Sequence, residues 1–182
     1  MNEEQDRLQL AAEAKAELDK RKSIFLAKRN TMIIDQKFLD ELTAQAKANP
    51  RLRQAYDLRT TSDDKSQRML NALEPGTIMP IHRHRNTSET MVMVRGKLIE
   101  RFYDDDGKIT EEFVMEPCGQ HPMVQIEAGQ WHSLETLEEG TIIFEAKDGA
   151  YVQLSSADLW RTTCCTKSET NKQELFSDRH NM

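Results

Sequence analysis

The sequence predicts an all-β barrel or sandwich with a short helical region in front of it. From about Gln67 to Leu159, apolar and polar residues alternate with a period of two, in short runs such as TMVMV, ITEEFVM and TIIFEA. Turn-forming dipeptides, among them PG, RG, AG and DG, separate these runs at regular intervals. Many short strands at such a spacing are typical of β-barrels and β-sandwiches.

Residues 1–31 are rich in alanine and in charged residues of both signs, and they contain few large apolar side chains. This composition favours a solvated helix that buries little, or a disordered extension. The extension is expected to be an appendage of the folded domain.

A helix is expected over residues 36–49. Asp35 precedes it as the N-cap, and Asn49, followed by a proline, ends it. The large apolar residues recur one, three or four positions apart and therefore share one face: Phe38, Leu39, Leu42 and Ala46. This face is expected to pack on the β-domain.

Eight runs are expected to form the strands of a barrel over about residues 67–160: QRMLNAL, TMVMV, KLIERFY, ITEEFVM, MVQIEA, WHSLETL, TIIFEA and YVQLS. The acidic DDDG segment at 104–107 is expected to form a hairpin turn. We place the folded domain at residues 32–165. Residues 166–182 are polar and are expected to form a disordered tail.

Length and charge exclude several classes of protein. At 182 residues the chain is long enough for one domain of ordinary size. Its formal net charge is −6, so it lacks the basic surface that binds nucleic acid. It has no apolar run long enough for a membrane span or a signal peptide, and its 3 cysteines form no disulfide framework. These features predict a soluble, cytoplasmic protein without a nucleic-acid or membrane partner.

The stretch GTIMPIHRHRNTSETMVMVRG carries two histidines and a glutamate in a segment that otherwise looks like β-structure. Because side chains alternate across a strand, His82 and His84 are expected on one face. Glu89 shares a face with Met91 and Met93, where an unpaired carboxylate would be costly. A metal ion would compensate this charge, and the two methionines would form the floor of the pocket.

A third histidine, His132, follows a glycine turn in EAGQWHSLETL. Three neutral imidazoles and one carboxylate suit Zn, Fe, Mn, Co, Ni or Cu without distinguishing among them, and they leave one or two coordination positions open. The neighbouring Trp131 is expected to face away from His132. His121, beside a proline in a loop, is expected at the surface.

These residues match the first cupin motif, G-x5-H-x-H-x4-E-x6-G, at every defined position: Gly76, His82, His84, Glu89 and Gly96. The second motif, G-x5-P-x-G-x2-H-x3-N, is matched only at Gly129 and His132, with His121, Glu127 and Thr136 at its other three positions. Residues 32 to about 160 resemble the WbuC-type cupin-fold metalloproteins, a bacterial family named for a gene of O-antigen polysaccharide clusters. The likeness includes SQRMLNALEPGT, HRHR, FYDDDGKI, GQWHSLETL and FEAKDGAY, and it departs at Ala150, where the family tends to have proline.

This resemblance implies a double-stranded β-helix, in which two antiparallel sheets form a small cupin barrel (jelly roll) around one divalent transition metal. It assigns the metal ligands: His82, His84, Glu89 and His132. Arg68 and Lys147 lie in stretches shared with the family and are the leading candidates for anchoring an anionic or hydroxyl-rich ligand. The family also implies a homodimer, with outward apolar residues such as Ile99 and Tyr103.

Three functions are compatible with these observations. The first is a metal-dependent isomerase, hydrolase or oxygenase that acts on a small polar molecule, which the family's name suggests is related to carbohydrate. The second is a non-catalytic, metal-containing module that binds or senses a small ligand, because no dedicated acid, base or nucleophile is evident beside the metal. The third makes residues 1–31 a partner-docking arm on a regulatory domain.

Overall fold

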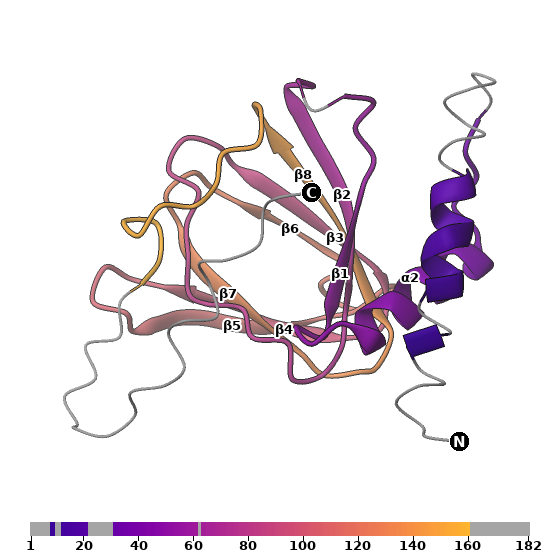
Figure 1. The fold of residues 1–182 in the computed structure, drawn as a ribbon. Helices are drawn as coiled ribbons and strands as arrows, with labels where there is room; N and C mark the ends of the chain where they lie inside the picture. The colour runs from indigo at the N-terminus through magenta and orange to yellow at the C-terminus, as the bar shows by residue number, and fades with distance from the viewer. Residues whose placement is uncertain (1–7, 10–11, 22–30, 62, 161–182) are drawn as a thin grey trace, which may run out of the picture.

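The structure, a computed structural model, describes residues 8–9, 12–21, 31–61 and 63–160. In these residues two antiparallel sheets face each other across a common interior (Figure 1). The five-stranded sheet has the order β1-β2-β8-β3-β6, and the three-stranded sheet has the order β5-β4-β7. The strands are β1 Arg53–Asp57, β2 Ser66–Leu73, β3 Glu89–Arg95, β4 Leu98–Tyr103, β5 Ile109–Met115, β6 Met123–Ile126, β7 Trp131–Thr136 and β8 Thr141–Asp148. The expected all-β fold, a double-stranded β-helix with a short N-terminal helical region, is confirmed.

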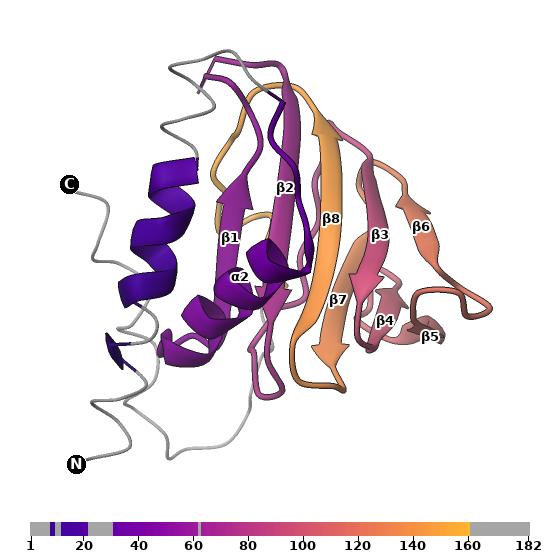
Figure 2. The same cartoon turned by 90° about the vertical axis from the view of Figure 1, so that its right-hand side faces the viewer.

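Helix α2 (Gln36–Ala48) begins as predicted and ends one residue before the expected boundary. The carboxylate of Asp35 accepts a hydrogen bond of 2.9 Å from the backbone N–H of Phe38, which satisfies a donor in the first turn. At the other end, the N–H of Asn49 donates to the last turn. The predicted apolar face is buried against the outer side of the five-stranded sheet, where it contacts residues of β1, β2 and β8 (Figure 2).

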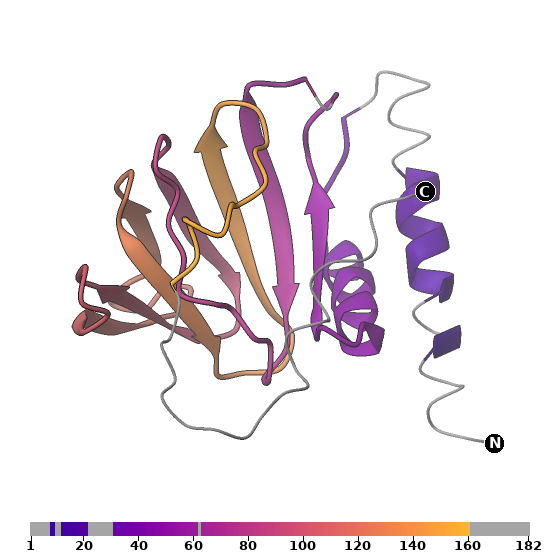
Figure 3. The same ribbon diagram turned by 60° about the vertical axis from the view of Figure 1, so that its left-hand side comes forward.

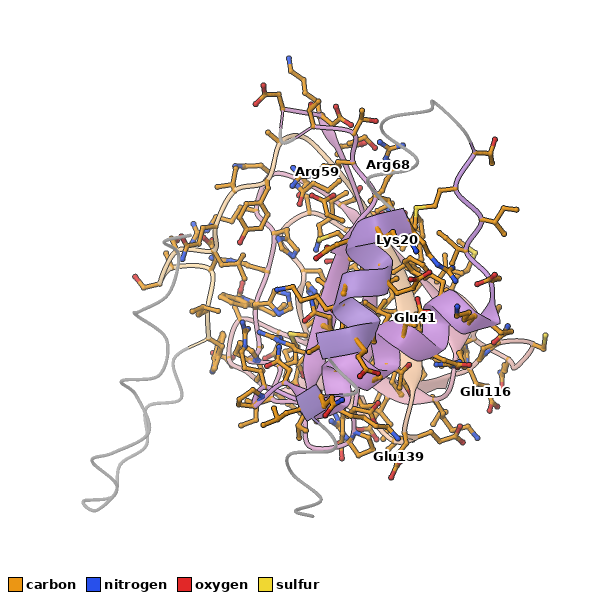
Figure 4. The ribbon with its side chains drawn as sticks, turned by 45° about the vertical axis from the view of Figure 1, so that its right-hand side comes forward. Lys20, Glu41, Arg59, Arg68, Glu116 and Glu139 are labelled. Atoms are coloured by element: carbon orange, nitrogen blue, oxygen red, sulfur yellow. The ribbon has the colours of Figure 1, made fainter. Side chains whose placement is uncertain are left out.

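Residues 12–21 form a helix that lies beside α2, with Lys20 on this helix and Glu41 on α2 (Figure 4). We expected the N-terminal segment to bury little, yet the side chain of Leu18 is only 2% exposed and belongs to the same apolar cluster as the inner face of α2. The guanidinium of Arg21 lies 3.3 Å from the carboxylate of Asp35, at the N-terminus of α2. Buried Leu18 and the ion pairs of Arg21 with Asp35 and Glu41 thus attach a mostly charged helix to the domain.

Leu18→Ala is expected to lower the free energy of unfolding by about 2–5 kcal/mol, because it removes a buried side chain and leaves a cavity. Urea denaturation followed by circular dichroism measures this loss. Leu8→Ala is the matched control, since Leu8 is 52% exposed. Equal stability of the two variants would show that the N-terminal helix adds nothing to the core.

The interior between the sheets follows the predicted alternation. Its buried apolar residues come from seven strands, β2 to β8: Leu73, Met91, Met93, Leu98, Met115, Ile126, Leu134 and Ile143. Gly96, the last residue of the first motif, has a φ of +78°, and a Cβ atom at this position would clash with Thr141 on the neighbouring β8. Glycine is therefore required at the tight turn between β3 and β4. Ile99 and Tyr103 alternate with inward-facing residues of β4 and lie on the outer side.

Two strand predictions were wrong. The run YVQLS is not a strand, and Tyr151 and Val152 in it are exposed. Strand β1 was missed because Tyr56 is its only buried residue, so its sequence shows no alternation. The DDDG turn is confirmed, since the N–H of Gly107 donates to the carbonyl of Asp104 between β4 and β5.

Several expectations fall on residues beyond those described. The predicted tail 166–182 lies outside the described residues, as do Cys164 and Cys165 and most of 1–31. The boundaries of the domain therefore stay a proposal. Among the described helices, none has the length and apolar character needed to cross a membrane.

Candidate metal centre

The segment that carries His82 and His84 runs between β2 and β3 and is not the regular strand that we expected. His82 forms isolated bridges with two distant residues, His132 of β7 and Leu159. The N–H groups of His82 and His132 each donate to the other's carbonyl, at 3.0 and 2.9 Å. The chain after β8 returns along the outer side of this segment (Figure 3), where the N–H of Arg83 donates to the carbonyl of Asp158. The segment is therefore held in place from both sides.

The structure brings the four predicted metal ligands together. One ligand atom from each of His82, His84, Glu89 and His132 lies within 4.8 Å of those of the others. The imidazole rings of His82 and His132 are 4.2 Å apart between centroids, and those of His82 and His84 are 5.3 Å apart. Four donor atoms at such separations surround a volume that can hold one metal ion.

The orientation of two imidazoles is fixed by the backbone. Nδ1 of His82 lies 3.0 Å from the carbonyl oxygen of Pro80, and Nδ1 of His132 lies 3.0 Å from that of Gln130. A carbonyl only accepts, so each Nδ1 carries the proton and each Nε2 presents a lone pair to the cluster. This is the tautomer that coordinates a metal through Nε2.

Glu89 is the negative member of the cluster and is 4% exposed. Its Oε2 lies 3.2 Å from Nε2 of His84 and 3.6 Å from Nε2 of His132, yet it has no hydrogen-bond partner among the described residues. Burial acts to raise the pKa of this carboxyl, but the two imidazoles and Lys147 hold the pKa well below its ordinary value. Glu89 is thus a carboxylate with one oxygen directed into the cluster.

Burial, together with the neighbouring His132 and His84, lowers the pKa of His82 to about 3. His82 is therefore neutral at ordinary pH, which leaves its Nε2 lone pair free to coordinate a metal.

Lys147 approaches the same cluster from β8. Its Nζ lies 2.9 Å from Oε1 of Glu89, 3.3 Å from Nε2 of His84 and 3.5 Å from the carboxylate of Glu145. An ammonium group only donates, so Nε2 of His84 accepts from it. Burial acts to lower the pKa of Lys147, but Glu145 and Glu89 raise it on balance. Lys147 is thus a buried cation at the edge of the four-residue cluster, and its role in binding a ligand stays a prediction.

The other sequence-derived candidates fall on two different sides of the sheet. Met91 and Met93 are buried inside the barrel on the same face as Glu89. Arg68 pairs in register with Ala146, one position from Lys147, and so lies on the opposite face of the sheet. Its guanidinium contacts Asp64 at 3.4 Å near one end of the molecule (Figure 4). The structure does not bring Arg68 to the cluster; the residue of β2 that faces inward beside Lys147 is Gln67.

Trp131 faces away from His132, as expected. The guanidinium of Arg83 lies 4.2 Å from the centre of its ring, and its indole N–H donates to Asp105. His121 lies outside the cluster, with its ring 5.1 Å from that of Phe113.

Sequence reasoning missed one residue of the interior, Glu100 on β4, which is fully buried. The alternation in LIERFY carried the signal, because Glu100 stands between Leu98 and Phe102 on the inward face. The signal was not followed because glutamate is rarely fully buried.

Comparison with known families and curated proteins gives no activity for this chain. Residues 34–115, less than half of the chain, match the family model described as a domain of unknown function (DUF6016). A search of curated proteins finds no match.

Solved structures similar to this chain are cupin-fold proteins. Oxalate decarboxylase from Bacillus subtilis is 21% identical, with a TM-score of 0.43 over 54% of this chain and 25% of that chain. The Cnp3 cupin domain of Schizosaccharomyces pombe is 10% identical, with a TM-score of 0.44 over 53% of this chain and 64% of that chain. The capsular polysaccharide assembling protein CapF from Staphylococcus aureus is 22% identical, with a TM-score of 0.46 over 58% and 28%. The chain spans less than two thirds of the length of each of these proteins. Similarity at this distance does not show which activity this chain has.

Proposed function

We propose that this protein is a cupin metalloprotein that binds one divalent transition metal through His82, His84, Glu89 and His132. One observation carries the proposal: the Nε2 lone pairs of His82 and His132 and the unpartnered Oε2 of Glu89 face one another in a buried space, with Nε2 of His84 beside them. Hydrogen-bond acceptors that converge without a donor repel one another, and a cation among them removes the repulsion.

The metal, when bound, supplies a Lewis acid that polarises an oxygen of a small polar ligand. The chain's own residues define the rest of the site. Lys147 neutralises Oε1 of Glu89 and leaves Oε2 for the metal. Met91 and Met93 fill the interior beyond Glu89 and exclude water from that side.

Elemental analysis of protein purified without added metal is expected to find about one transition-metal ion per chain. His82→Ala and His132→Ala are expected to lose most of this metal, because each removes one of four ligands. His121→Ala is the matched control, a histidine outside the cluster, and should keep the metal. Full occupancy in both cluster variants would rule out this site.

The finer assignments are proposals of the same kind. We propose that the chain is a WbuC-type cupin that acts in the cytoplasm and forms a homodimer. Its ligand is a small molecule, for example one related to carbohydrate. Light scattering of the purified protein tests the dimer. A monomer at micromolar concentration would contradict it.

A non-catalytic binding module is the second candidate. The observation that favours it is Lys147, whose ammonium group is already engaged by Glu89, Glu145 and His84 and so does not serve as a free base. Recovery of a bound ligand unchanged after prolonged incubation, followed by NMR, would support binding over catalysis.

A further inference from the structure

Glu100 is a buried acid that the metal site does not use. It lies on the inward face of β4 and is 0% exposed. Neither of its carboxyl oxygens has a hydrogen-bond partner among the residues that the structure describes. Buried polar side-chain atoms are rarely left in this state, so each exception calls for a reason, such as a missing ligand.

The strand register places Glu100 next to the metal cluster. On the three-stranded sheet Phe102 is opposite His132, and Glu100 is opposite Leu134, the next inward position of β7. On the facing sheet Glu145 is opposite Met91, the next inward position after Glu89 and Lys147. Glu100 therefore belongs to the layer of the interior directly beyond the metal ligands. Thr136, one inward position further along β7, also has a buried hydroxyl oxygen without a partner.

Burial makes Glu100 a hydrogen-bond donor. Removal from water, together with the charges of Glu89 and Glu145, raises the pKa of this carboxyl to about 9. At neutral pH the group is therefore a neutral carboxylic acid, which has one O–H donor and an acceptor oxygen. By the strand register, this group lies in the layer next to the side chains proposed to hold the cation.

The charges in the interior indicate which kind of ligand lies beside Glu100. With a divalent metal in place, the cation and the Lys147 ammonium group, which contacts Glu89 and Glu145, carry three positive charges. Glu89 carries one negative charge and Glu145, whose pKa burial raises to about 7, carries at most one more. With Glu100 neutral, at least one positive charge is left without a counter-charge. Uncompensated charge is unfavourable in a buried site, so a monoanion at an open metal position is preferred over a neutral ligand.

We propose that the barrel binds a small carboxylate anion, and that Glu100 selects it by donating a hydrogen bond to one of its oxygens. This inference rests on the proposed metal site, since the metal holds the carboxylate that Glu100 contacts. A carboxylate satisfies both requirements at once, because it supplies the missing negative charge and offers several acceptor lone pairs. A neutral sugar supplies only the acceptors.

The test uses the full chain loaded with Co(II), with its absorption spectrum as the readout. Formate is the probe, since it is the smallest carboxylate, and formamide is its neutral counterpart of similar shape. The wild-type protein is expected to bind formate at least about ten-fold more tightly than formamide. Equal affinities for the two, or no formate binding, would overturn the inference.

Two variants separate the role of Glu100 from that of the metal. Glu100→Leu removes the donor and is expected to weaken formate binding by about ten-fold, whereas Glu100→Gln keeps an N–H donor and is expected to lose less. Both should retain the metal, because Glu100 is not among its ligands. Unchanged formate affinity in Glu100→Leu overturns the inference. If Glu100→Leu folds poorly, Glu100→Gln decides in its place, and a loss of its formate affinity of about ten-fold or more overturns the inference. Absence of metal from the wild-type protein overturns the proposed function instead.

Discussion

The metal-free protein is expected to lose stability steadily as the pH rises from about 4.5 to about 9, and Glu100 is the main cause. Burial raises the pKa of Glu100 to about 9, whereas in the unfolded chain the pKa returns to its ordinary value of 4.5. Between these values the unfolded state binds fewer protons than the native state, so the free energy of unfolding falls with increasing pH. At about 1.4 kcal/mol for each pH unit, the loss at neutral pH amounts to roughly 3 kcal/mol.

Glu100→Gln is expected to remove this dependence, because an amide does not titrate, and to be more stable than the wild-type protein at pH 8. Urea denaturation from pH 5 to pH 9 in the presence of a chelator measures both curves. Below about pH 6.5 two other groups offset each other: burial and Glu89 raise the pKa of Glu145 to about 7, which lowers stability as the pH rises, whereas burial lowers the pKa of His82 to about 3, which raises it. Glu111→Gln, on the exposed strand β5, is the matched control and should follow the wild-type curve. Parallel curves for the wild type and Glu100→Gln would contradict the prediction.

Lys147→Met is expected to destabilise the metal-free protein by about 3–5 kcal/mol, because it leaves the buried carboxylates of Glu89 and Glu145 without their cation. Lys147 is only 9% exposed in its side chain, and Glu89 is 5% exposed, so solvent does little to replace the lost contact. A metal ion that binds Glu89 restores a positive charge beside it. Much of the loss is therefore expected to disappear when Zn²⁺ is added before denaturation.

The comparison of the metal-free and metal-loaded variant is the decisive measurement. Lys97→Met is the matched control: its ammonium group lies 2.8 Å from Glu116, but the side chain is 33% exposed, so solvent screens the pair and its loss is expected to change stability little. An equal loss of stability in Lys147→Met with and without Zn²⁺ would show that the metal does not reach Glu89.

Sequence patterns predicted which four residues the structure brings together, because their spacing is tied to side-chain direction. Alternation along a strand placed Glu89 with Met91 and Met93, and a glycine turn placed His132 at the start of its strand. The prediction holds for His82 although its segment is irregular, because two backbone bridges hold this segment in an extended path.

What escaped prediction depends on tertiary packing. Arg68 and Gln67 are neighbours, and only the pairing with β8 shows that Gln67 faces Lys147. Glu100 was missed because a lone carboxyl in a barrel contradicts the ordinary preference for apolar residues there. Leu18 lies in a charged segment whose docking on α2 depends on a surface formed elsewhere in the chain.

The two carbonyl groups that orient His82 and His132 belong to the main chain, at residues 80 and 130. Point substitutions cannot delete a main-chain oxygen. The orientation of these two imidazole rings is therefore set by the path of the backbone. An engineer who wishes to alter metal preference can therefore exchange Glu89 for a softer or a neutral donor while the imidazole geometry persists.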